Sequence, residues 1–393
     1  MSRLHPLSNP YPARFWLLFA GVLFSMTCNS FIWPFATIFI AEQTQSGLSL
    51  TAFMFTIQAC ASGLSVGYTS KLMDLYGRKR LMVAGLVLHA GTRLLMSDAT
   101  SLITWGVLMA LMGVVSPLFS VGGNAMVADL LPGEQRSGAY ALLRTAMNLG
   151  IVVGPMIGGW IISRYSFQTT YWSTALLLLL LAGLAGFFLR ETRPQIAPRP
   201  DQARESVWKD RVFVKVLGFY TLSVMGFIEM FFLLPIYLKQ HFQILEDQSS
   251  LLFSVNALIV VAFQYLTTRT TERLPPLLMM ALGSFVYACA LGSITYLGTF
   301  SHFVLAMVVL TAGEMIINPT VTNYASNLAP EHMRARYMGM LEMVYRFALG
   351  VSPLAGGLIN DLIDPSLIWL YGSVITLFGT AGFLRLHLEK SSG

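Results

Sequence analysis

Five ionisable side chains lie deep inside long apolar stretches of this sequence, and their types and spacing limit the chemistry available to it. They are Arg144, Glu229, Glu314, Glu342 and Arg346. An ionised side chain at the centre of a membrane-spanning helix costs roughly 2.5 to 3.5 kcal/mol, so each should face a partner or a water-filled cavity. Two of the five are basic and three are acidic, a net charge of −1. That balance favours a bound cation, or a proton on one of the acids.

Two of the acids, Glu314 and Glu229, are the candidates for proton coupling. A carboxylate in a low-dielectric environment has a raised proton affinity and can exchange its proton for an arriving cation. This exchange is the minimum chemistry of proton:cation antiport. The alternative is that either acid is hydrogen-bonded to a neighbouring helix and acts as a structural clamp.

Glu342 and Arg346 are four residues apart, so on a helix they share one face and can form an ion pair. One hypothesis is a fixed structural pair, because pairing is how buried charges usually persist. The other is a gate whose ion pairs change partners during transport. Both residues, together with Arg144, are also candidates for contact with a substrate.

Aromatic and polar side chains in the same apolar stretches suit a bulky, partly apolar substrate. Aromatic rings beside a carboxylate can bind a lipophilic cation. The alternative is that most of these rings only pack or contact lipid. The candidate substrate-binding residues, besides the three charged ones, are Asn29, Trp33, Ser120, Asn124, Phe232 and Asn318.

The elements that must position these residues are membrane helices. Of 393 residues, 55% are hydrophobic and only 11% are charged, against about 25% charged in an average soluble domain. This composition excludes an ordinary soluble enzyme. A span needs about 20 apolar residues, and twelve such stretches are predicted: 15–41, 48–70, 80–97, 101–127, 137–163, 169–189, 212–238, 249–268, 276–297, 302–327, 335–360 and 367–386.

The charges between these stretches predict the topology. Lys and Arg cluster in alternate connections, so both termini and the linker 191–211 are expected on the cytoplasmic side of the cell membrane. The same clustering argues against nucleic acid as the reason for the net charge of +6. The three cysteines are far apart and make no metal motif. No metal or cofactor is expected.

The two halves of the sequence repeat at a constant offset. Pro155 aligns with Pro353, and Gly158 and Gly159 align with Gly356 and Gly357, each pair 198 residues apart. Parallel six-helix repeats with a site at their interface are typical of rocking secondary transporters. We therefore expect an all-α fold of twelve transmembrane helices in two pseudo-symmetric bundles, 1–190 and 212–393, joined by the linker 191–211.

Three motifs resemble those of the major facilitator superfamily, over nearly the whole chain. SKLMDLYGRKRL, residues 70–81, is similar to the family's cytoplasmic signature. GIVVGPMIGGW, residues 150–160, resembles the signature of its antiporter branches, and FFLRETRP, residues 187–194, resembles drug-efflux relatives. The second motif places Gly154, Pro155, Gly158 and Gly159 at a smooth, bent helix face.

The resemblance implies a monomeric carrier and a cytoplasmic gate. Asp74, Gly77 and Arg78 match the cytoplasmic signature, and Arg78 is expected to reach Asp129. Asp74 would dock on the positive N-terminal end of the eleventh helix. Glu272 is the repeat counterpart of Asp74 and joins the gating candidates.

These observations favour a secondary active transporter, most simply a proton-coupled exporter of small amphipathic, drug-like molecules, cations included. Its partners would be the small-molecule substrate, protons and the lipid bilayer. The alternative is a facilitator or importer of sugars, amino acids or organic anions, with Arg144 and Arg346 as anchors. A receptor or sensor built on a transporter fold is the third hypothesis. The sequence has no enzyme motif and no Walker motif, so an ion or substrate gradient must supply the energy.

Overall fold

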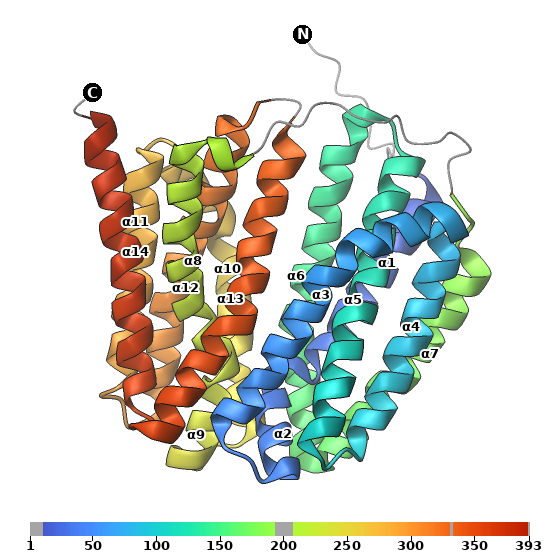
Figure 1. Cartoon of the computed structure of the whole chain (residues 1–393), viewed down its shortest axis with the longest axis horizontal. Coiled ribbons are helices and arrows are strands. Elements are labelled where there is room, and N and C mark those ends of the chain that lie inside the picture. The colour runs from blue at the N-terminus through green and yellow to red at the C-terminus, as the bar shows by residue number, and fades with distance from the viewer. Residues whose placement is uncertain (1–10, 193–206, 331–332, 392–393) are drawn as a thin grey trace.

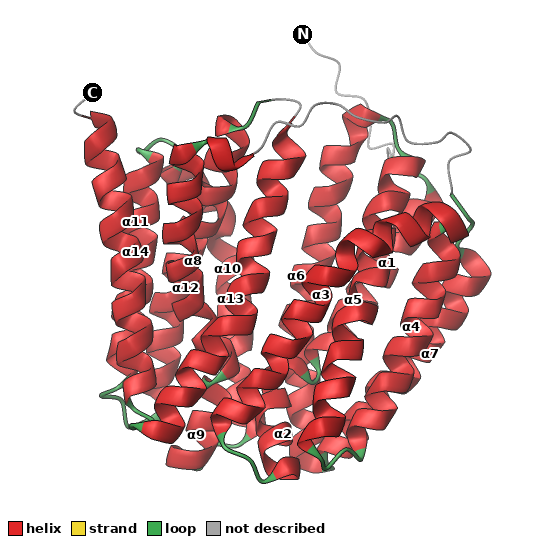
Figure 2. Ribbon diagram, viewed as in Figure 1, coloured by secondary structure: helices red, strands yellow, loops and turns green. Residues whose placement is uncertain are grey.

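The structure, a computed structural model, describes residues 11–192, 207–330 and 333–391. Within these ranges the regular structure is helical throughout, as Figure 2 shows. Two short 3-10 turns, η1 (Trp33–Phe35) and η2 (Val207–Lys209), accompany the α-helices. The α-helices are α1 (Ala13–Ser30), α2 (Ala36–Thr44), α3 (Leu48–Tyr76), α4 (Arg78–Ser97), α5 (Leu102–Leu130), α6 (Gly133–Arg164), α7 (Phe167–Phe188), α8 (Arg211–Phe232), α9 (Leu234–Phe242), α10 (Glu246–Thr271), α11 (Pro276–Ile294), α12 (Phe300–Leu328), α13 (Arg334–Leu362) and α14 (Leu367–Ser391).

The helices pack as two groups, α1–α7 and α8–α14, which stand side by side in Figure 1. In the first group α1 packs on α6, α3 on α5, and α4 on α7. The equivalent pairs in the second group are α8 with α13, α10 with α12, and α11 with α14. The groups meet mainly through α3 with α13 and α6 with α10. Because the same pairs recur in both groups, the sequence repeat is also a repeat of packing.

Ten helices in the described ranges are long and apolar enough to cross a membrane. Neither α4 nor α13 is among them. Both carry charge along their length, Arg93 in α4 and Glu342 with Arg346 in α13. The chain is thus a multi-pass membrane protein, and the count of twelve spans stays a prediction.

The first and seventh predicted spans, 15–41 and 212–238, are broken where the sequence suggested continuous helices. α1 stops at Ser30 and α2 restarts after η1, which contains Pro34. α8 gives way to α9 with Pro235 in its first turn. A proline lacks the amide hydrogen that a continuous helix needs and crowds the preceding turn, so it ends or kinks the helix there.

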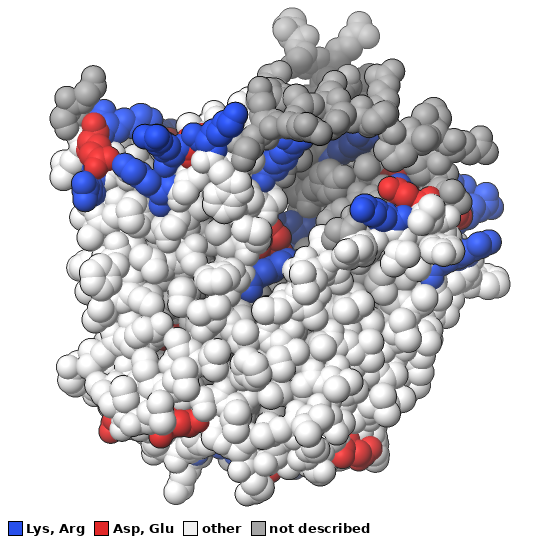
Figure 3. Space-filling model, viewed as in Figure 1, with Lys and Arg blue, Asp and Glu red and all other residues white. Residues whose placement is uncertain are grey.

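Both ends of the described chain lie at one face, which we call the terminal face; the opposite one is the distal face (Figure 1). In the space-filling view, a hollow opens between the two groups toward the terminal face, and charged side chains line its inner part (Figure 3). Toward the distal face the groups touch closely. A Cβ built on Gly159 of α6 would lie 2.8 Å from the Glu246 carbonyl oxygen of α10. The structure is therefore open at one face and closed at the other.

Candidate functional site

Charged residues from both groups meet around Tyr220 of α8. The Tyr220 hydroxyl is within electrostatic reach of Arg144 on α6, Glu314 on α12 and Glu342 on α13. It also donates a hydrogen bond to the Asn318 Oδ1 at 3.0 Å. The structure thus brings together four residues predicted from the sequence, and we call this cluster the central site.

Glu314 is half-buried and belongs to a short hydrogen-bonded chain. Asn256 Nδ2 of α10 donates to Glu314 Oε2 at 2.8 Å and to Thr311 Oγ1 at 2.9 Å. Thr311 in turn donates to the Met307 carbonyl at 2.6 Å. Sequence analysis missed Asn256 because nothing in the sequence shows that α10 packs beside α12. These hydrogen bonds hold the Glu314 carboxyl group in a fixed position at the edge of the central site.

The ion pair expected between Glu342 and Arg346 is present. Arg346 Nη2 lies 3.0 Å from Glu342 Oε1, and the side chains of Arg346 and Glu342 are 35% and 61% exposed, respectively. Arg346 Nη1 also donates to Ser62 Oγ of α3 at 2.9 Å. Exposed pairs contribute about 0 to 1 kcal/mol, so a ligand can separate this pair at low cost. Through its bond to Ser62, Arg346 links α13 of the second group to α3 of the first.

Glu229 is placed differently, inside the second group. Its side chain is fully buried, and its Oε1 accepts a long hydrogen bond from Ser352 Oγ at 3.4 Å. The other carboxyl oxygen, Oε2, has no hydrogen-bond partner among the described residues and lies against Gly372 of α14. Glu229 is therefore separate from the central site, and its role in proton coupling stays a prediction.

An aromatic layer lies between the central site and the distal face. Trp33 of η1 meets Phe232 of α8 with ring centroids 5.0 Å apart, and Phe55 of α3 meets the same ring at 4.8 Å. Phe231 and Phe227 continue the layer within α8. Phe232 is twelve residues beyond Tyr220, about 18 Å along a helix. Trp33 and Phe232 thus help to close the cavity rather than line the central site.

Asn29 is already engaged by a residue that sequence analysis missed, Arg93 of α4. Arg93 Nη2 donates to Asn29 Oδ1 at 2.8 Å, and the guanidinium lies over the Tyr171 ring at 5.8 Å. Arg93 is 6% exposed. It sits beside the C-terminal end of α1, where helix carbonyls favour a cation. A basic residue inside an apolar stretch was the available signal, but Arg93 lies close to the end of the predicted span.

Two further candidates, Ser120 and Asn124, are exposed on α5. The Ser120 hydroxyl bonds back to the Pro117 carbonyl at 3.3 Å, and the Asn124 carbonyl accepts from Tyr140 Oη at 3.2 Å. The bond from Tyr140 uses the backbone carbonyl of Asn124 and not its side-chain amide. Their substrate-binding role stays a prediction.

Four of the five gating candidates, Asp74, Gly77, Arg78 and Asp129, lie together at the terminal face. Arg78 bonds to Asp74 Oδ1 at 2.7 Å and to Asp129 Oδ2 at 3.1 Å, which matches the expected contact between Arg78 and Asp129. Gly77 has φ +100°, a conformation that favours glycine. The Glu191 carboxylate, not anticipated from the sequence, accepts from the Arg78 amide at 2.7 Å. Glu272 is exposed at the end of α10.

The glycine motif of α6 makes the close contact expected from its spacing. Cβ atoms built on Gly150 and Gly154 would lie 2.8 and 2.7 Å from backbone atoms of α1, and Gly158 contacts the backbone of Phe31, the residue after α1. Gly159 faces α10 instead. Pro155 lies inside the helix. The motif thus packs α6 against α1 on one side and against the second group on the other.

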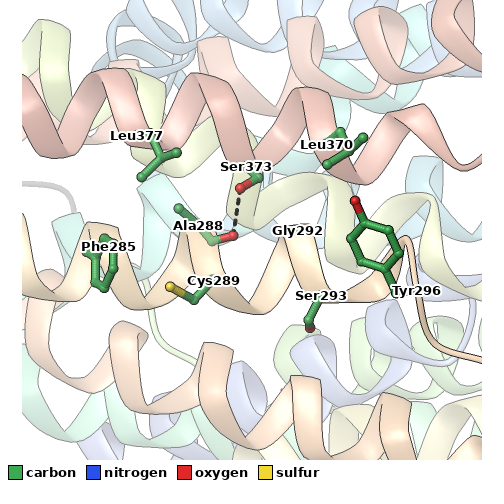
Figure 4. A pocket seen from close by; sticks show the side chains of 9 residues that line it. All are labelled: Phe285, Ala288, Cys289, Gly292, Ser293, Tyr296, Leu370, Ser373 and Leu377. Atoms are coloured by element: carbon green, nitrogen blue, oxygen red, sulfur yellow. Dashed lines mark hydrogen bonds between the residues drawn. The ribbon is translucent and has the colours of Figure 1, made fainter.

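A separate apolar groove lies between α11 and α14, away from the central site. Figure 4 shows Phe285, Cys289 and Tyr296 along it, with Ser373 donating to the Ala288 carbonyl at 2.8 Å. It has no charged side chain in its lining. The groove therefore offers none of the chemistry that the central site offers.

Two helical groups around a charged site, open at one face and closed at the other, define a membrane transporter. The chain matches the family model of the Major Facilitator Superfamily over residues 18–353 and 230–392, and it belongs to that family. Its family and relatives are transporters rather than enzymes.

Two relatives of this chain carry names that state an activity. The chain is 25% identical over 373 residues to the Na(+), Li(+), K(+)/H(+) antiporter of Planococcus maritimus, covering 85% of this chain and 87% of that protein. It is 25% identical over 357 residues to the multidrug resistance protein MdtH of Yersinia pestis, covering 85% of each. Among solved structures, a peptide transporter POT in complex with sulfate is similar, with a TM-score of 0.80, 13% identity and coverage of 98% and 95%.

Proposed function

We propose that this protein is a secondary active transporter that exports small amphipathic molecules, cations included, in exchange for protons. The observation that supports it best is Glu314, a half-buried acid held by Asn256 at the edge of the central site, with the aromatic layer on the distal side of that site. Such a carboxyl group can carry either a proton or a cationic substrate, but not both at once. Competition for one carboxyl group is sufficient to couple two opposite flows.

In this proposal the terminal face is cytoplasmic and the present conformation is inward-open. Basic side chains gather at that face in Figure 3, in agreement with the positive-inside rule. The protein would be a monomer with twelve spans in the cell inner membrane. Residues 1–190 and 212–393 would form the two bundles that rock about the central site.

The terminal-face cluster would act as the cytoplasmic gate. Asp74 is 48% exposed and is held within its own bundle by Arg78. In the outward-open state we expect it to reach the N-terminal end of α13 instead, where the helix dipole favours a carboxylate. Asp74→Asn should then lower transport while leaving the amount of protein in the membrane unchanged; normal transport would contradict this role.

The names of the two relatives are in keeping with this function, since one is an antiporter that uses protons and the other a multidrug resistance protein. Trp33 and Phe232 would contact the apolar part of a bound drug as it passes toward the distal face. Asn318, Ser120 and Asn124 would supply polar contacts.

The test uses inside-out vesicles with an acidic interior and a dye that reports the pH gradient. Lipophilic cations and neutral drugs are added in turn to vesicles that contain the wild type, Glu314→Gln or Glu389→Gln. Glu389 is the matched control because it is a surface acid that pairs with Lys215. We expect a substrate to collapse the gradient in the wild type and in Glu389→Gln, but not in Glu314→Gln.

One observation favours a second function. Arg144 is exposed about a third of the way along α6 and has no hydrogen-bond or ion-pair partner among the described residues. A free guanidinium in the cavity suits a carboxylate or phosphate substrate, as in a facilitator of organic anions. If no compound collapses the gradient while the wild type and Glu314→Gln both equilibrate a labelled organic acid, and Arg144→Gln does not, the facilitator is correct.

A further inference from the structure

The distal closure includes two backbone contacts that the sequence repeat relates to each other. A Cβ on Gly357 of α13 would lie 2.9 Å from the Leu48 carbonyl of α3. A Cβ on Gly159 of α6 would lie 2.8 Å from the Glu246 carbonyl of α10. Gly357 and Gly159 are 198 residues apart in the sequence, and so are Glu246 and Leu48. The first residues of α3 and α10 are thus both pressed against a glycine of the opposite group.

Asp361, at the end of α13, also contacts the start of α3. Its Oδ1 accepts from the Leu48 amide at 3.0 Å, and its Oδ2 accepts from the Ser49 amide at 2.8 Å and from Ser49 Oγ at 2.6 Å. The first amides of a helix have no partner within the helix and are usually satisfied by a side chain just before it. For α3 that position is Gly47, which has no side chain. A carboxylate from the other group supplies the missing cap.

The same contact exists in the other seam with different chemistry. Ser163, the repeat counterpart of Asp361, accepts from the Asp247 amide of α10 at 3.2 Å. The residue preceding α10 is Leu245, which cannot cap it either. One repeat therefore carries a charged cap and the other a neutral one. A carboxylate gives the stronger hydrogen bonds and is further favoured by the helix dipole.

We propose that Asp361 is a latch of the distal face, a helix cap made in trans that holds α3 to α13 only when that face is closed. When the groups separate there, the amides of Leu48 and Ser49 lose their acceptor. Asp361 is a positioning residue and need not touch substrate. This inference rests on the alternation of openings proposed above, but it does not depend on protons or on the nature of the substrate.

A nearby acid provides the matched control. Asp364 lies three residues after Asp361, and among the residues that the structure describes its carboxylate bonds within its own turn, to the Ser366 amide at 2.8 Å and to Ser366 Oγ at 2.5 Å. It carries the same charge at the same face but does not join the two groups. A general effect of negative charge at the distal face would therefore appear with either residue, whereas a latch requires Asp361.

The experiment measures how often the distal seam opens. Ser250, 3% exposed, lies in the seam between α6 and α10, and its Cβ would be 2.9 Å from a Cβ on Gly159. We would introduce Ser250→Cys into a variant in which the three native cysteines are replaced by alanine. Purified protein in detergent is then treated with a maleimide, so that access does not depend on membrane orientation. Because Ser250 is on the other seam, the reporter senses separation of the groups rather than local space at Asp361.

We expect Asp361→Ala to raise the labelling rate by roughly 2-fold to 30-fold. This is the change in the ratio of open to closed molecules that the loss of a helix N-cap would cause. Asp364→Ala should leave the rate unchanged. Equal rates in Asp361→Ala and its parent, or an equal rise in Asp364→Ala, would overturn the latch.

If Asp361→Ala does not accumulate, Asp361→Asn and Ser49→Ala decide instead. Each removes part of the cap, so each should label faster than the parent, and parental rates in both would overturn the proposal. Labelling needs no substrate and no pH gradient. A transport assay that fails would therefore leave this result standing, and the reverse is also true.

Discussion

A single methyl group at the distal seam should shift the protein toward the state that is open at the distal face. In Gly357→Ala the new Cβ would lie 2.9 Å from each of three backbone atoms, the Leu48 carbonyl oxygen and the Ser49 N and Cα. Backbone atoms at the start of a helix cannot rotate away as a flexible side chain can. Overpacking of this kind costs about 1 to 3 kcal/mol, and only the closed state bears that cost.

The expected consequence is a change of roughly 5-fold to 150-fold in the ratio of closed to open molecules, since about 1.4 kcal/mol corresponds to a factor of ten. Spin labels on Ser101→Cys and Gln248→Cys, exposed positions near the distal ends of the two groups, would report it as a longer distance in pulsed EPR. Gly183→Ala is the control, because no atom of a neighbouring helix lies within 4 Å of the place its methyl group would occupy. An unchanged distance distribution in Gly357→Ala would refute the view that this seam is set by backbone contact.

Three further predictions concern other parts of the molecule. Gly77→Ala should lower the unfolding midpoint, because φ +100° strains a side chain by about 1 to 3 kcal/mol; an unchanged midpoint would contradict the strain. Although its burial acts to raise the pKa of Asp361, hydrogen bonds from Ser49, Asn360 and Leu48 outweigh it and hold that pKa below its usual range. Distal closure should therefore be constant from pH 8 to 5 and weaken only below about 4, as Asp361 takes up a proton, which the EPR distance can follow. Arg93→Ala should reduce thermal stability, because it leaves Asn29 without its donor, while Arg93→Lys should recover part of the loss.

Much of the helical framework could be predicted because a membrane span is recognised from the hydrophobic composition of a single continuous stretch of sequence. The repeat made the paired glycines recognisable, and the four-residue spacing of Glu342 and Arg346 was enough to predict their ion pair. The break around Pro34 was not foreseen, since a proline in a long apolar run is compatible with a kink as well as with an interruption.

The contacts of the site were less accessible to sequence reasoning, because they join residues far apart in the chain. Asp361 was visible only as an acid in a connection, and its role as a cap depends on where α3 begins in space. Arg93 and Asn256 similarly depend on which helices pack together. Glu229 and Glu314 have the same residue type and similar apolar neighbours in sequence, yet Glu229 is fully buried inside one bundle and Glu314 is half-buried at the central site.

The glycine contacts across the distal seams also bear on how sharply the molecule changes state. At these glycines there is no long side chain that could extend to keep the contact as the groups move apart, whereas the Lys239–Glu42 ion pair and the Asp361 cap cross the same face through side chains. A gap of 0.5 to 1 Å already forfeits about a quarter to a half of the dispersion energy of such contacts. Half-open arrangements therefore lose the glycine contacts and keep only longer side-chain contacts such as the Lys239–Glu42 ion pair. The backbone part of the seam should favour its closed and fully open positions over intermediate ones.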